Sequence, residues 1–429
     1  MLKLSCIPFL LVLAFGSTAC HKTTSPLKQR LARLDQIVDP YIKDEKIAGF
    51  VGVILHDGEP VYQRAIGWAD REAKRPMQMD TIFRIASLTK AMTTVAALML
   101  VEEGKLKLDE PLGKYVGSFY YTKVAKKDDT IPPDPVTKKN TLKEERQYRP
   151  ITIEQLLAHT SGISYAMHRD FQDYFKKANL NIGPLPSWYL AGSHDTICRT
   201  AYKLGRIPLV TQPGNAWVYG YSTDVLGCVI EKVSGMKLDE FFRTRITEKL
   251  GMKDTHFYLP KEKKDRLAVL YGSNGGGKVS RSPYQGNYVD GPRTNFGGGA
   301  GLLSTINDYV KFIEMLRNGG EYDGVRYLKP ETVKLMTTNQ VGERYGQKGY
   351  GFSYGFEVFD KSNETPYGEY SYGWFGAYGP YVRVYPREKV VMLQMTQLFP
   401  NGADMREKII AEVQTAVAEQ HRGTRLASR

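Results

Sequence analysis

The hydrophobic residues of this chain follow two different periods, and their order along the sequence predicts the elements of the fold. Residues 27–42 are apolar at helical spacing, with Pro40 as an expected kink. Two β-rich segments, 50–55 and 60–68, flank a short polar turn, which predicts a β-hairpin. Residues 91–101 are rich in Ala, Leu and Met and are apolar on every side. Such a pattern predicts a helix that is buried in a core.

The C-terminal part of the chain returns to β-rich runs. Ser304 is expected to cap a helix, and a last helix is expected over 403–419. Short polar turns separate the last three β-rich runs, which is typical of an antiparallel meander. The runs are 350–359, 370–374, 378–385 and 390–396.

Strands at both ends of the sequence and short helical patterns between them predict the fold class. We expect an α/β (α+β) fold with one antiparallel sheet flanked by helices and a mostly helical inserted domain. Residues 120–149 are polar and contain Pro132-Pro133-Asp134-Pro135, which predicts an exposed loop. The expected divisions are a signal peptide (1–19), a tether (20–30), a discontinuous α/β domain (31–110 and 300–425) and an insertion (111–299).

The first twenty residues have the pattern of a processing segment. A short positive region precedes an apolar run at 7–15, which is too short to span a bilayer. Small residues then lead to Cys20, as in the lipidation sites of bacterial lipoproteins, although Ser17 stands where leucine is usual. We expect export to the bacterial periplasm or cell envelope, with a lipid on Cys20 as the only membrane attachment. An ordinary cleaved signal is the alternative.

Composition narrows the classes of partner and cofactor. The formal charge of +13 is spread over lysines and arginines interleaved with acids, so we expect no nucleic-acid binding. The seven histidines are isolated, which argues against a metal site. Gly272-x4-Gly277-Lys278 approaches a phosphate-binding loop, but Val279 stands where Ser or Thr should follow. We therefore expect no cofactor. Cys198 and Cys228 either form a disulfide or are separate buried thiols.

The strongest chemical feature is Ser87-x-x-Lys90 at the start of the buried helix. The two side chains lie one turn apart on the same face, where the helix N-terminus favours negative charge. A lysine beside a serine in a dry site can make the hydroxyl nucleophilic without a histidine. The alternative is an N-cap serine beside a lysine that only reaches toward solvent.

Four further segments accompany this pair, and together they resemble a known family. They are Leu157-x-His159-Thr160-Ser161-Gly162, Trp217-x-Tyr219, the glycine-rich run 297–305 and Trp374-x-Gly376. Their order is similar to that in the serine β-lactamase-related family, in particular its class C branch. That branch also contains carboxylesterases, D-aminopeptidases, acyltransferases and D,D-peptidases. The resemblance extends from about Leu31 to Thr396.

The resemblance implies a role for each matching residue. Ser87 would be the acylated nucleophile, Lys90 would help to activate it, and Tyr219 would move protons between nucleophile, leaving group and water. The backbone N–H groups of Ser87 and Ala377 would form the oxyanion hole. We expect His159 to be structural and to pack its loop under the site.

The chain also departs from the lactamase pattern at its expected substrate contacts. Tyr221 stands where lactamases have an asparagine that holds the substrate amide, and Trp374-Phe375-Gly376 replaces Lys-Thr-Gly. An indole cannot pair with a substrate carboxylate as that lysine does, but it can form an apolar wall. We expect Tyr221, Trp374, Phe375 and Gly376 to contact substrate, with Phe375 filling or narrowing the site.

These features predict an exported, monomeric serine hydrolase that acts through a Ser87 acyl-enzyme, with carboxylic esters as the expected substrates. Within the same class, the alternatives are a D,D-peptidase or D-aminopeptidase, a weak β-lactamase, and an acyltransferase. A non-catalytic module that binds the cell envelope is the alternative of another class.

Overall fold

The centre of the protein is an antiparallel sheet built from both ends of the chain. The computed structural model describes residues 26–427 except 168, 181–187, 274–276 and 362–368, so the predicted signal segment and Cys20 lie outside the described residues. Within the described part the sheet has eight strands, in the spatial order β12-β13-β14-β15-β16-β1-β2-β3. In that order they are Tyr350–Phe352, Glu357–Lys361, Glu369–Phe375, Tyr381–Tyr385, Val390–Met395, Gly49–His56, Glu59–Asp70 and Arg75–Pro76.

The sheet confirms the prediction that strands from both ends of the sequence form one sheet. The N-terminal strand β1 pairs with the C-terminal strand β16 on one side and with β2 on the other. Successive side chains of a strand point to opposite faces. Phe50 and Ile54 of β1 therefore join the core on one face, whereas Val51 and Val53 join the core on the other. Both faces are covered, which explains why this strand is apolar without alternation.

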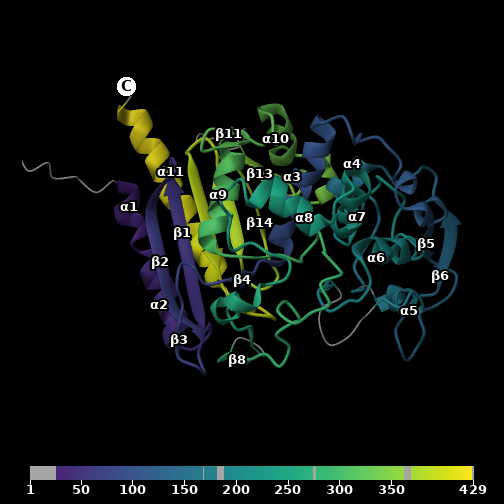
Figure 1. The fold of residues 1–429 in the computed structure, drawn as a ribbon, viewed down its shortest axis with the longest axis horizontal. Helices are drawn as coiled ribbons and strands as arrows, with labels where there is room; N and C mark the ends of the chain where they lie inside the picture. The colour runs from purple at the N-terminus through teal and green to yellow at the C-terminus, as the bar shows by residue number, and fades with distance from the viewer. Residues whose placement is uncertain (1–25, 168, 181–187, 274–276, 362–368, 428–429) are drawn as a thin grey trace, which may run out of the picture.

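Helices cover both faces of the sheet (Figure 1). On one face α1 and α2 pack against α11, and on the other α9 packs against β1 and β16. The helices are α1 Pro26–Leu31, α2 Leu34–Lys43, α3 Thr89–Glu102, α4 Ile153–Leu157, α5 Gln172–Lys177, α6 Ile197–Leu204, α7 Ser222–Ser234, α8 Leu238–Phe242, α9 Ile306–Arg317, α10 Pro330–Thr337 and α11 Met405–Ala427. No helix in the described part of the chain is long and apolar enough to cross a bilayer.

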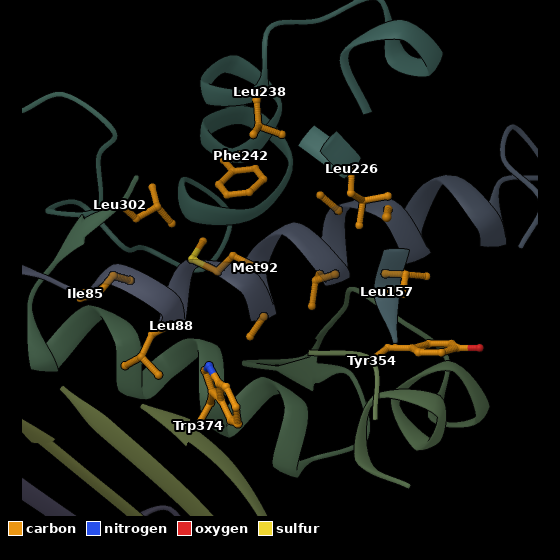
Figure 2. Close-up of a cluster of buried hydrophobic side chains, with 14 of the residues drawn as sticks. Ile85, Leu88, Met92, Leu157, Leu226, Leu238, Phe242, Leu302, Tyr354 and Trp374 are labelled. Atoms are coloured by element: carbon orange, nitrogen blue, oxygen red, sulfur yellow. The ribbon is translucent and has the colours of Figure 1, made fainter. Parts of the chain in front are cut away.

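Helix α3 is buried on every side, as its sequence predicts. Every residue from Thr89 to Leu100 is buried. Figure 2 shows Leu238 and Phe242 of α8 on one side of this helix, and Leu88 and Trp374 on the side toward the sheet. The helix is thus enclosed between the sheet and the helices α7 and α8, and its N-terminal end lies beside the end of β14.

The predicted loop at 120–149 contains a β-hairpin instead. Strands β5 (Lys123–Lys127) and β6 (Leu142–Arg146) pair over five residues and carry cross-strand ion pairs such as Lys126–Glu145 at 2.7 Å. The hairpin is anchored where Ala125 N–H donates to the carbonyl of Leu209. Its charged strands lack an apolar period, so the hydrophobic pattern could not predict them.

Other element boundaries differ from the prediction for local reasons. The run 350–359 is two strands, because the chain turns between Ser353 and Phe356, with Gly355 at φ 96°. Thr305, not Ser304, caps α9, and its side chain accepts the Asp308 N–H. The first helical segment breaks near Arg33, whereas Pro40 lies inside α2.

A disulfide joins two helices of the helical region behind the glycine-rich run. Cys198 of α6 and Cys228 of α7 form a disulfide, which settles the choice that the sequence leaves open. The remaining paired strands are short: β4 (Phe83–Arg84) with β9 (Leu303–Ser304), β7 (Tyr271–Gly272) with β8 (Ser280–Arg281), and β10 (Glu321–Tyr322) with β11 (Val325–Arg326).

Candidate active site

Ser87 lies on a tight turn that leads into α3. Ala86–Leu88 form a single 3₁₀ turn, and Ala86 has a left-handed backbone with φ of 45°. Ala86 and Leu88 are buried, whereas Ser87 is half-buried. The turn is held on both sides, because Ile85 N–H donates to Leu302 and Tyr309 Oη donates to the carbonyl of Leu88 at 2.8 Å. The serine hydroxyl is therefore presented from a fixed backbone.

Lys90 is fully buried and has three hydrogen-bond acceptors around its Nζ. These are Ser87 Oγ at 3.3 Å, Tyr165 Oη at 3.2 Å and the carbonyl oxygen of Gly299 at 2.8 Å. The predicted placement of Ser87 and Lys90 on one face of the helix is confirmed.

This arrangement suits both protonation states of the amine. An ammonium group has three N–H donors, and the three acceptors match them. A neutral amine has two, which Gly299 and Tyr165 can accept, so its lone pair is left to face Ser87 Oγ. The geometry therefore allows Lys90 to take a proton from the serine hydroxyl and to hold it afterwards.

Tyr219 lies on the loop that precedes α7, as the sequence predicts, and it contacts Lys90 through its ring. Lys90 Nζ lies 4.6 Å from the ring centroid of Tyr219. The hydroxyl of Tyr219 accepts a hydrogen bond from the indole Nε1–H of Trp374 at 3.2 Å. Trp374 therefore supplies a polar contact as well as apolar surface, which the sequence reasoning did not foresee.

Tyr165 is a site residue that the sequence reasoning missed. It is buried, its hydroxyl contacts Lys90, and its ring packs edge-on against Tyr219 with centroids 5.6 Å apart. Burial raises the pKa of Tyr165 well above its usual value, so the residue is a neutral phenol at physiological pH. Its position shortly after the segment that ends at Gly162 was the only signal available.

Asp224 is a second missed residue, and it is linked to Lys90 through the main chain of Gly299. Asp224 Oδ1 accepts the N–H of Gly299 at 2.9 Å. The carbonyl oxygen of Gly299 in turn accepts a hydrogen bond from Lys90 Nζ. A Cβ at Gly299 would overlap the carboxylate, which explains the glycine there. Burial raises the pKa of Asp224 to about 6, although the charge of Lys90 opposes the rise.

His159 packs beneath the site, as expected. It is buried, and its ring lies 4.9 Å from that of Tyr219. Burial and the nearby charge of Lys90 lower the pKa of His159 well below its usual value. The imidazole is therefore neutral and supports the tyrosine by contact.

The four expected substrate contacts occupy different environments. Phe375 is 42 % exposed, but Trp374 is 5 % exposed and packs against Tyr219 and Phe352. Tyr221 is 3 % exposed because it precedes α7 and its ring packs against Tyr165 and Phe175. The expectation that Tyr221 faces substrate is therefore wrong. Trp374 and Gly376 are buried as well, so Phe375 is the exposed member of the four.

Gly376 follows the end of β14 and touches the nucleophile turn. An added Cβ there would overlap the carbonyl oxygen of Ile85, so only glycine allows the two backbones to approach this closely. Ala377 comes next and packs in a small cluster with Ala86 and Tyr378. The two segments that carry the predicted oxyanion donors, Ser87 and Ala377, are thus in contact.

Comparison with known proteins identifies the family. The family model described as Beta-lactamase matches residues 34–417. The chain belongs to this family. It is 28 % identical to esterase EstB of Burkholderia gladioli over 81 % of this chain and 85 % of that one. It is 33 % identical to the lovastatin esterase of Penicillium rubens over 66 % and 67 % of the two chains.

A solved structure agrees in fold. EstCE1, a hydrolase with promiscuous acyltransferase activity, has a TM-score of 0.73 at 26 % identity and covers 92 % of this chain and 100 % of its own. The fold is that of the β-lactamases and transpeptidases, as predicted, and the protein is a serine hydrolase of the beta-lactamase family.

The raised pKa of Asp224 predicts a pH-dependent stability difference. The folded protein keeps the Asp224 proton up to about pH 6, whereas the unfolded chain releases it near 3.8. Wild type should therefore lose about 2 kcal/mol of unfolding free energy relative to Asp224→Asn between about pH 4 and pH 7. Chemical denaturation of both proteins across this range measures the difference. A difference that does not change with pH would contradict the prediction.

Proposed function

We propose that the protein hydrolyses carboxylic esters through an acyl-enzyme on Ser87. The observation that carries this proposal is the Lys90 amine, enclosed 3.3 Å from Ser87 Oγ, with Tyr219 against it. The two esterase relatives support the reaction class. The non-catalytic alternative is disfavoured, because the buried Lys90 lies beside a half-buried serine and the relatives include two esterases.

In the acylation step Ser87 Oγ attacks the ester carbonyl while Lys90 takes the hydroxyl proton. The negative charge on the former carbonyl oxygen would be held by the backbone N–H groups of Ser87 and Ala377. Collapse of the intermediate releases the alcohol, which needs a proton. In the proposed mechanism Lys90 returns this proton, alone or through the hydroxyl of Tyr219.

Deacylation reverses the roles with water as the nucleophile. Water attacks the acyl carbonyl and gives a proton to the Lys90 amine. This proton passes to Ser87 Oγ as its bond to the acyl carbon breaks, and the carboxylic acid is released. Trp374 holds the Tyr219 hydroxyl by its indole N–H throughout, and the neutral Tyr165 and the carbonyl of Gly299 keep Lys90 in place.

The residues around Tyr219 favour esters over β-lactams and D-alanyl peptides. Trp374 stands where the lactamases and peptidases of the family carry the lysine that attracts a substrate carboxylate. The rings of Trp217 and Trp374 pack against that of Tyr219. The exposed ring of Phe375 lies next to Trp374 and adds apolar surface there. Such a surrounding suits an ester with an apolar part.

An active-site fluorophosphonate tests the nucleophile. Wild type should be labelled at Ser87, and Ser87→Ala should not be labelled, because the reagent forms a bond only with an activated serine. Intact-protein and peptide mass spectrometry locate the adduct. A wild-type protein that takes up no label would overturn the hydrolase mechanism.

A substrate panel tests the ester preference with the same preparation. Short p-nitrophenyl esters should be turned over faster than D-alanyl peptides and a chromogenic cephalosporin, with Ser87→Ala as the blank. Faster turnover of the cephalosporin than of the esters would refute the argument from Trp374. Adding an alcohol to the assay tests for acyl transfer, because a new ester forms if the alcohol accepts the acyl group in place of water.

The contact between Trp374 and Tyr219 predicts a selective effect on turnover. Trp374→Phe removes one hydrogen bond but keeps an aromatic ring, so kcat should fall about 5-fold. Trp217→Phe is the matched control, because the indole N–H of Trp217 has no hydrogen-bond partner in the described part of the chain. Steady-state kinetics on an activated ester compare them. Equal effects of the two substitutions would assign Trp374 a packing role only.

We further propose that the protein is exported to the bacterial periplasm or cell envelope and is lipid-anchored through Cys20. The pattern of residues 1–20 supports this, and so does the disulfide between Cys198 and Cys228, because disulfides persist in oxidising compartments.

Mass spectrometry of protein from a bacterial host should find a lipidated N-terminal Cys20, and Cys20→Ser should move the protein from the membrane to the soluble fraction. A mature chain without lipid, or one that starts elsewhere, would contradict the anchor.

A further inference from the structure

Arg84 is a buried arginine whose guanidinium donates its hydrogen bonds to neutral oxygen atoms in the described part of the chain. Its guanidinium donates to the carbonyl of Ala268 at 2.6 Å, to that of Gln285 at 2.6 and 3.1 Å, and to Gln397 Oε1 at 3.1 Å. The ring of Tyr288 covers one face, with its centroid 5.5 Å from Cζ. A buried cation is costly unless its donors are satisfied, so these contacts fix the side chain firmly.

Gln397 binds Arg84 at the main chain as well as at the side chain. The N–H of Arg84 donates to Gln397 Oε1, and Gln397 Nε2 donates back to the carbonyl oxygen of Arg84, both at 3.1 Å. Both peptide groups that flank the Arg84 Cα are therefore held by one amide. The two residues are 313 positions apart in the chain, so this is a tertiary contact and not a local turn.

The contact lies between the two segments that carry the predicted oxyanion donors. Arg84 is three residues before Ser87. Leu398, the neighbour of Gln397, donates its N–H to the carbonyl of Tyr378 at 2.9 Å, directly after Ala377. Gln397 and Leu398 thus link the Ser87 segment to the Ala377 segment from behind.

The backbone between Arg84 and Ser87 gives a reason for such a link. Ala86 has φ of 45°, a conformation that residues with a Cβ adopt rarely. Conformations of this kind persist only where the surrounding structure holds the chain on both sides. On the C-terminal side the carbonyl of Leu88 is bound by Tyr309, and on the N-terminal side Arg84 is bound by Gln397.

We propose that Arg84 and Gln397 are positioning residues that set the separation of the Ser87 and Ala377 N–H groups, and thereby the oxyanion hole. The proposal rests on the proposed function, which assigns those two donors. An oxyanion hole works only when its donors lie within hydrogen-bond distance of the developing oxyanion. A shift of either segment weakens one donor while the site that binds the substrate ground state is unchanged.

Gln397→Met tests this positioning role, and Gln394→Met is its matched control. Both glutamines are buried, at 5 % and 2 % exposure, and lie three residues apart, but Gln394 is not hydrogen bonded to Arg84. The kcat for an activated ester should fall about 10- to 100-fold in Gln397→Met with KM little changed, and should stay near wild type in Gln394→Met. The fluorophosphonate labelling rate of Ser87 should fall in parallel.

A spectroscopic measurement separates positioning from a general loss of structure. The acyl-enzyme is formed with a ¹³C-carbonyl ester, and its C=O stretching band is read by infrared difference spectroscopy. Weaker hydrogen bonds from the hole polarise the carbonyl less, so the band should move to higher wavenumber in Gln397→Met and not in Gln394→Met. An unmoved band with rates equal to those of the control would overturn the proposal.

Two further comparisons keep the test decisive. If Gln397→Met does not fold, Arg84→Lys replaces it, because lysine keeps the charge but cannot reach the Gln285 and Gln397 acceptors together. A wild-type protein that is not labelled by the fluorophosphonate refutes the proposed function itself. Labelled wild type with no selective loss in either variant refutes only the positioning role.

Discussion

The site depends on the burial of one amine. Lys90 is enclosed by α3, the glycine-rich run and the loop of Tyr219, and its hydrogen-bond acceptors in the described chain are neutral oxygen atoms. An unsatisfied buried amine would be strongly destabilising, so its acceptors must be supplied by segments that are distant in the sequence. The convergence of Ser87, Tyr165 and Gly299 is therefore a requirement of folding as well as of chemistry.

The glycine-rich run is best understood from the same requirement. Gly299 offers its carbonyl to Lys90 and its N–H to Asp224, and Gly298 offers its carbonyl to Thr93, one turn further along α3. The carboxylate leaves no room for a side chain at Gly299. Asp224 thus places a compensating charge near the amine without a direct ion pair, and the Nζ keeps its contact with Ser87 Oγ.

What the sequence could predict depends on how far apart the partners lie. Ser87 and Lys90 are one helical turn apart, so their contact follows from helix geometry, and the sheet follows from β-rich runs at the two ends of the chain. Tyr165 is 75 residues from Lys90 and Gln397 is 313 from Arg84, and no periodicity reports such contacts. The sequence predicted an apolar wall from the indole of Trp374. Its N–H donates to the Tyr219 hydroxyl because β14 ends beside the loop that carries Tyr219.

The order of the strands also affects when the protein can become an enzyme. β1 lies between β2 and β16, so the central strand pairs are complete only after nearly the whole chain is available. Pairings of such long sequence separation form late and slowly, because the intervening loop must close first. The turn that carries Ser87 rests on the sheet through β14, which also comes from the C-terminal part. A growing or truncated chain therefore carries Ser87 and Lys90 before the C-terminal strands that complete their surroundings are present.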